Sequence, residues 1–88
     1  MGEFGIEFSK DAFKTYKKLD SQLKKKIDNL LLMLSRGDRI DFKPIRGIDD
    51  TYRIRVGSIR VLIKKLKDDK IFLVFKIGPR GDIYKDIL

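Results

Sequence analysis

The chain of 88 residues contains no cysteine, no histidine and no tryptophan. Without cysteine it can form neither a disulfide nor a thiolate metal site, which fits a reducing compartment. Without histidine it lacks the commonest general base and the commonest metal ligand. No apolar run approaches the ~20 residues of a membrane-spanning helix, and no signal-peptide pattern opens the sequence. We therefore expect a soluble, cytoplasmic protein with no metal, cofactor or membrane partner.

Positive charge, in contrast, is in excess: 21 Lys and Arg residues face 13 Asp and Glu residues, for a net charge of +8. Such a balance attracts polyanions. The stretch from Thr51 to Lys67 holds six basic residues and no acid. A high charged fraction can also serve stability on the surface of a heat-stable protein, but the clustering favours binding. The length and a hydrophobic fraction of 42% predict that residues 1–88 form a single domain.

Apolar periodicity predicts a strand and then a helix hairpin in the first half of the chain. Residues 4–8 alternate like a strand, and Ser9 can cap a helix that continues through Leu19. Asp20 and Ser21 then cap a second helix, whose apolar stripe has helical spacing. Gly37 is expected to end that helix. Residues 38–50 are expected to be a linker.

The stretch YRIRVGSIRVLI, residues 52–63, predicts a tight hairpin of two strands over residues 51–56 and 59–66. If Gly57 and Ser58 form a two-residue turn, Arg55 lies opposite Arg60. Every second residue is then apolar and faces the helices. Three arginines share the opposite face: Arg53, Arg55 and Arg60.

A third strand is expected over residues 71–77. An odd-length loop centred on Asp69 would turn its odd-numbered residues toward the helices and set Lys76 beside Leu62 on the arginine face. The odd-numbered apolar residues are Ile71, Leu73, Phe75 and Ile77. The expected fold is therefore a two-layer α+β domain: an N-terminal strand, an antiparallel helix hairpin and a three-stranded antiparallel meander.

Like charges on neighbouring strands repel, so a sheet that sets Arg55 against Arg60 is expected to bind an anion there. The planar guanidinium suits phosphate because it donates two hydrogen bonds at once. Lys64 and Lys76 would extend this phosphate-binding surface. After the turn at Gly78 and Pro79, Tyr84 could stack on a base, or be an ordinary, partly buried aromatic residue. These features predict binding of single-stranded nucleic acid or phosphate-rich RNA.

Four segments, in order, resemble the RelE/ParE toxin superfamily and extend over almost the whole chain. They are IEFSKDAFKTYKKL, KPIRG, YRIRVGSIRVLI and IGPRGDIY. Ile45 stands where the family usually has leucine, and Ser58 and Ile59 stand where an acid and an aromatic residue are common. The resemblance is to the RelE-type, archaeal-like members.

The resemblance implies a RelE-like fold and a toxin of a type II toxin–antitoxin system. Such a toxin is a metal-independent endoribonuclease (an mRNA interferase), which cleaves mRNA in the ribosomal A site and inhibits translation. Its implied partners are a cognate antitoxin, the ribosome and mRNA. Two alternatives stay open: a non-catalytic, ParE-like gyrase inhibitor, and a basic RNA-binding module with degenerate chemistry.

Carried over residue by residue, the resemblance makes Arg60, Arg80 and Tyr84 catalytic and makes Arg53 and Arg55 bind phosphate. Some members of the family have lysine at the last two positions. Arginine is a poor proton acceptor, so Arg53 and Arg55 are expected to clamp phosphate. Tyr84 is the only candidate for proton transfer, provided that nearby arginines lower its pKa from about 10. Otherwise it stacks on a base.

Overall fold

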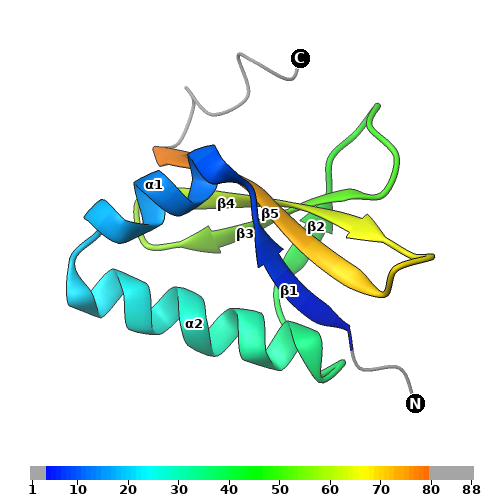
Figure 1. The fold of residues 1–88 in the computed structure, drawn as a ribbon, viewed down its shortest axis with the longest axis horizontal. Coiled ribbons are helices and arrows are strands. Elements are labelled where there is room, and N and C mark those ends of the chain that lie inside the picture. Colours follow the sequence, from blue (N-terminus) through cyan, green and yellow to red (C-terminus); the bar gives the residue numbers. More distant parts are fainter. Residues whose placement is uncertain (1–3, 80–88) are drawn as a thin grey trace.

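The computed structural model describes residues 4–79, which form one five-stranded sheet and two helices (Figure 1). The strand order is β1-β5-β4-β3-β2, with β1 parallel to β5 and the other neighbours antiparallel. The predicted α+β class is confirmed. The elements are β1 (Gly5–Phe8), α1 (Lys10–Lys18), α2 (Ser21–Ser35), β2 (Phe42–Pro44), β3 (Thr51–Val56), β4 (Ile59–Leu66) and β5 (Ile71–Pro79).

The helices begin where the sequence supplies caps. The Ser9 hydroxyl accepts a hydrogen bond from the backbone N–H of Ala12 at 3.1 Å, and Asp20 accepts one from Leu23 at 2.9 Å. These bonds satisfy donors that the first turn of a helix leaves free. Gly37 follows α2 with φ of 82°, the left-handed conformation that stops a helix. The predicted helix boundaries are thus confirmed.

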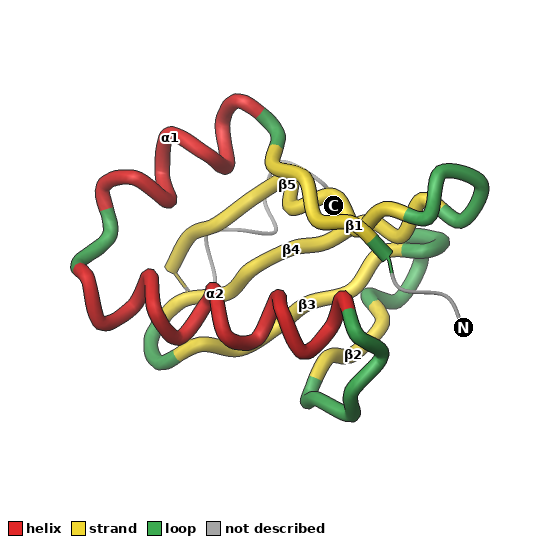
Figure 2. The backbone as a smooth tube through the Cα atoms, turned by 60° about the horizontal axis from the view of Figure 1, so that its bottom comes forward, coloured by secondary structure: helices red, strands yellow, loops and turns green. Residues whose placement is uncertain are grey.

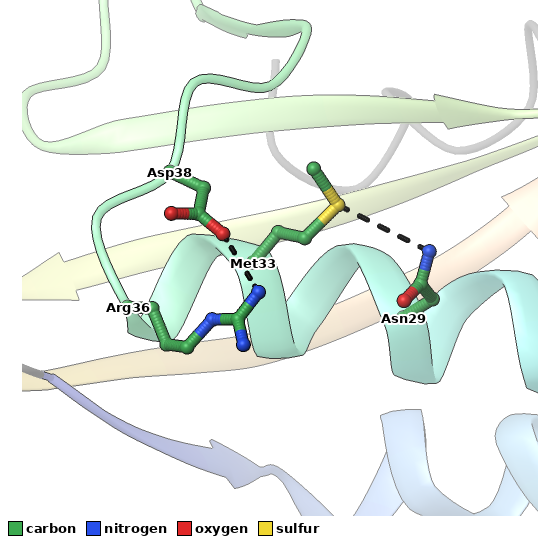
Figure 3. Close-up of polar contacts among 4 residues, drawn as sticks. All are labelled: Asn29, Met33, Arg36 and Asp38. Atoms are coloured by element: carbon green, nitrogen blue, oxygen red, sulfur yellow. Dashed lines mark hydrogen bonds and ion pairs between the residues drawn. The ribbon is translucent and has the colours of Figure 1, made fainter.

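Polar contacts at the outer surface of the helices are local. At the end of α2, an Arg36 guanidinium nitrogen lies 2.9 Å from an Asp38 carboxylate oxygen, and the Asn29 amide nitrogen lies 4.0 Å from the Met33 sulfur (Figure 3).

Between the helices, the Tyr16 hydroxyl donates a hydrogen bond to the Asp28 carboxylate. This bond raises the pKa of Tyr16 to about 12. No helix within residues 4–79 has the length and apolar content needed to cross a bilayer.

Both helices cover the same face of the sheet. α1 packs on β5 and β1, while α2 packs on β1 and β3 (Figure 2). Between the layers lies a core of buried apolar side chains. From the helices it takes Ala12, Ile27, Leu31 and Leu34, and from the sheet Ile54, Val56, Val61, Ile63, Phe72, Val74 and Ile77.

The predicted hairpin of β3 and β4 is confirmed in its register. Val56 pairs with Ile59, and Arg55 pairs with Arg60. Gly57 has φ of 58° in the turn, which residues other than glycine rarely adopt. Ile54, Val56, Val61 and Ile63 therefore face the helices, and the arginines face away from them.

The prediction for β5 is correct at one end of the strand and wrong at the other. Leu62 pairs with Lys76 as expected, but the next pair along the ladder is Ile63 with Val74. Phe75 is thus the extra residue of a β-bulge, which reverses the alternation of faces beyond it. Leu66 pairs with Ile71, so the expected odd-length loop at Asp69 is also wrong.

Because of the bulge, different residues of β5 enter the core from those expected. Phe72 and Val74 face the helices and are 5% and 0% exposed. Ile71, Leu73 and Phe75 were expected there and are only half-buried.

The segment 38–50 was expected to be a linker, but it contains β2, in which Lys43 pairs with Arg53. The loop after β2 rises on the side away from the helices (Figure 1). It is held to the sheet by two backbone hydrogen bonds, from Ile45 to the Thr51 carbonyl at 2.9 Å and from Lys65 to the Asp50 carbonyl at 2.7 Å. A second, smaller apolar cluster forms on this face, from Ile45, Ile48, Leu62 and Phe75.

Candidate nucleic-acid interface

The face of the sheet that the helices leave uncovered carries the basic residues. Strand alternation and the observed register put six of them on this side. We call this surface the basic face, and its cations are Lys43, Arg53, Arg55, Arg60, Lys64 and Lys76.

Five of the six cations lie in two rows across the strands, and Lys64 lies in a third. In the first row, Lys43 pairs with Arg53, Arg53 with Leu62, and Leu62 with Lys76. In the second row, Arg55 pairs with Arg60, and Arg60 with Gly78. Neighbouring strands lie about 4.8 Å apart, so adjacent cations repel one another. A polyanion bound on the basic face would relieve this repulsion.

Arg60 is the exceptional member of the basic face, because its side chain is buried. It is 5% exposed, whereas Arg55 beside it is exposed. Its neighbour on the other side, Gly78, has no side chain to compete for the space. The face opposite the helices is therefore not fully open to solvent, because Arg60 is buried there.

Within residues 4–79, the recorded partner of the Arg60 side chain is a neutral carbonyl group. One guanidinium nitrogen donates to the carbonyl of Ile59 at 3.3 Å. No carboxylate within residues 4–79 forms an ion pair with Arg53, Arg55 or Arg60. Burying a charge costs free energy, and an anion bound beside Arg60 would offset that cost.

The structure brings five of the predicted site residues onto the basic face: Arg53, Arg55, Arg60, Lys64 and Lys76. The other two, Arg80 and Tyr84, lie outside the residues that the structure describes. The roles of all seven stay predictions. Sequence reasoning missed Lys43, since the three-residue β2 ends at a proline and shows no alternation. Within residues 4–79, no group of three or more carboxylates is arranged to hold a metal ion.

The fold and this face together define a class: a small α+β domain that presents a basic sheet surface suited to a polyanion. Comparison with known proteins specifies the family. Residues 6–84 match the family model described as the ParE toxin of type II toxin–antitoxin systems. The chain belongs to this family of toxins.

Curated relatives cover nearly the whole chain. A protein of Methanocaldococcus jannaschii named putative toxin RelE1 is 33% identical over 88 residues, covering 96% of this chain and 98% of that protein. The mRNA interferase toxin RelE of Escherichia coli is 24% identical over 85 residues, covering 92% of this chain and 90% of that protein.

Solved structures share the fold. The toxin of the E. coli RelBE toxin–antitoxin complex superimposes with a TM-score of 0.79 at 22% identity, covering 89% of this chain and 98% of that one. The archaeal RelE–RelB complex of Pyrococcus horikoshii gives a TM-score of 0.75 at 22% identity, covering 91% of this chain and 98% of that one. The predicted RelE-like fold is confirmed.

Proposed function

We propose that the protein is the toxin of a type II toxin–antitoxin pair and that it cleaves mRNA in the A site of translating ribosomes. The observation that carries this proposal is Arg60, a charge that is 5% exposed and has no carboxylate partner within residues 4–79. Family membership and the name mRNA interferase, given to the E. coli relative, support the same activity. A target on the ribosome implies action in the cytoplasm.

The proposed reaction is an internal transesterification of RNA. The ribose 2′-oxygen attacks the adjacent phosphorus, the bond from phosphorus to the 5′-oxygen breaks, and a 2′,3′-cyclic phosphate and a 5′-hydroxyl remain. The 2′-hydroxyl proton passes to a base, and the leaving 5′-oxygen receives a proton from an acid. Negative charge grows on the phosphate oxygens, and fixed guanidinium groups stabilise it.

In this scheme the rows of the basic face have separate roles. Arg60, held in place by burial, contacts the scissile phosphate together with exposed Arg55. Arg53 binds a neighbouring phosphate, and Lys64 and Lys76 bind further phosphates of the RNA strand. Arg80 acts with Arg60 on the developing charge, and Tyr84 transfers a proton or stacks on a base.

The basic face has few groups that can transfer a proton, and this accounts for dependence on the ribosome. The chain contains no histidine, and the six residues that define the basic face are all arginine or lysine. Positioning the RNA can supply several kcal/mol of the barrier, about 7 to 11 in the best-oriented cases. The ribosome would provide that positioning. A cognate antitoxin with acidic residues would neutralise the toxin by covering the same face.

The test is a charge-matched pair of double variants. Arg53→Ala with Arg55→Ala removes two cations from the basic face, and Lys25→Ala with Lys26→Ala removes two exposed cations from α2. Primer extension on a translated message should show breaks in A-site codons for the wild type and the α2 variant. The basic-face variant should lose them at least a hundredfold, since each lost contact to a charged transition state costs about 3 kcal/mol.

The same experiment separates the alternatives. Intact message accompanied by DNA breaks would replace the proposal with gyrase inhibition. Translation arrest without cleavage, still dependent on Arg53 and Arg55, would indicate an RNA-binding module with degenerate chemistry.

A further inference from the structure

An apolar pocket opens on the basic face, one step beyond the row that contains Arg53 and Leu62. Its volume is about 320 Å³, at the small end of ligand-binding pockets. It is lined by Ile48, Thr51, Lys64, Leu73 and Phe75.

Three strands and the loop after β2 build this pocket. Thr51 pairs with Lys64, and Lys64 pairs with Leu73, so these side chains form a third row across β3, β4 and β5. The bulge brings Phe75 to this side, and the loop supplies Ile48. The Thr51 hydroxyl is already used, because it donates to the Asp49 carbonyl at 2.9 Å. The interior is therefore apolar, and the Lys64 ammonium group marks the rim.

We propose that this pocket binds one nucleobase of a single-stranded RNA whose phosphates follow the basic face; this inference rests on the proposed function. A half-buried phenyl ring at a pocket of this size offers a surface on which a base can stack. Lys64 at the rim binds the phosphate of that nucleotide, and Arg53 binds the next one. Charge thus selects a polyanion, and the apolar walls select a planar ring.

The position of the pocket fits a nucleotide close to the scissile phosphate. The Lys64 row lies four residues along β4 from Arg60, about 13 Å at the usual rise of a strand. In the same row, on β1, the exposed acid Glu7 pairs with Leu73 and would repel a phosphate placed toward that edge of the sheet. The RNA is therefore expected not to continue across β5 toward β1.

The probe is a hexanucleotide of 2′-O-methyl RNA, which cannot be cleaved, compared with hexamers that lack the base at one position. Fluorescence anisotropy gives the affinity of each. Wild-type protein should bind the intact hexamer about tenfold more tightly than the hexamer abasic at the pocket position. Leu73→Ala should reduce this ratio to below about threefold.

Ile71→Ala is the matched control, because Ile71 is also aliphatic, half-buried and on the same face of β5, but does not line the pocket. It should keep the tenfold ratio. Arg55→Ala should weaken the intact and abasic hexamers by the same factor. Thermal melting of each variant excludes a folding defect.

Equal affinity of wild-type protein for all hexamers would overturn the pocket proposal. The proposed function would survive that result if Arg55→Ala still weakened binding, and would fail with it if Arg55→Ala had no effect. An unchanged ratio in Leu73→Ala, with weaker binding of the antitoxin, would instead assign the pocket to a protein side chain and overturn the nucleobase proposal.

Discussion

Burial distinguishes Arg60 from Arg53 and Arg55, although all three lie on one face of the hairpin. Replacing a buried charge by an apolar side chain of similar volume is often neutral or stabilising, because the desolvation cost disappears. The protein keeps arginine at a position where stability gains little from it. A functional site is a common reason for such a conflict.

Arg60→Met tests this conflict directly. We expect a melting temperature equal to or above that of the wild type, with a gain of up to about 4 kcal/mol in unfolding free energy. We expect mRNA cleavage to fall roughly a hundredfold. Lys25→Met, an exposed change on α2 with the same loss of charge, is the control and should alter neither quantity. A large drop in stability, or full cleavage, in Arg60→Met would contradict the interpretation.

For a single residue, the sequence predicts the face of the sheet on which the side chain lies better than it predicts how deeply that side chain is buried. The face that Arg53, Arg55 and Arg60 share follows from the alternation and from the Gly57–Ser58 turn, both of which are local. The burial of Arg60 depends on what covers the side chain, and alternation carries no information about that.

Among the elements, the helices and the first hairpin are predictable because their signals are local. Ser9, Asp20, Gly37 and Gly57 each specify a boundary by their own chemistry. The segment IFLVFKI of β5 differs, because its first five residues are all apolar and either alternation satisfies the core. Packing against α1 and β1 decides between them, and it selects Phe72 and Val74.

This register predicts opposite outcomes for two neighbouring substitutions in β5. Val74→Asp puts a carboxylate at a position that is 0% exposed, and we expect the loss of several kcal/mol and an unfolded protein. Leu73→Asp, at a half-buried position on the other face, should cost less than about 2 kcal/mol. Urea denaturation measures both. The reverse order of stabilities would favour the uninterrupted alternation and contradict the bulge.

The hydrogen bond between Tyr16 of α1 and Asp28 of α2 makes the stability of the protein fall at alkaline pH. The pKa of Tyr16 is raised from 10.0 to about 12 by its hydrogen bond to Asp28. The stabilisation from this bond is therefore fully present below pH 10 and is lost as the pH rises toward 12. Tyr16→Phe should destabilise the protein by about 1 kcal/mol at pH 8, and this difference should shrink above pH 10. A constant difference between pH 8 and pH 12 would contradict the proposed coupling.

For the whole molecule, the net charge of +8 matters less than its distribution. Binding of single-stranded RNA weakens with salt, with a slope of about −0.7 per phosphate contacted in a plot of log affinity against log salt concentration. Lys43→Ala should make the slope less steep by about 0.7 if this residue contacts a phosphate, and Lys25→Ala should leave it unchanged. Equal slopes for both variants would mean that the excess charge acts diffusely.

The order of strands in the sheet has a consequence for the timing of folding. β1 pairs with β5, so Gly5 finds its partner Ile71 only when that residue has been made, and Ser9 donates to the Val74 carbonyl at 2.9 Å. Synthesis proceeds from the N-terminus at about 5–20 residues per second, and pairings between distant segments form slowly. β5 also lies between β1 and β4, so neither layer closes until it arrives. A nascent chain that lacks β5 therefore cannot complete the two-layer fold, and the ribosome that makes this protein is not exposed to a fully folded copy before most of the chain is complete.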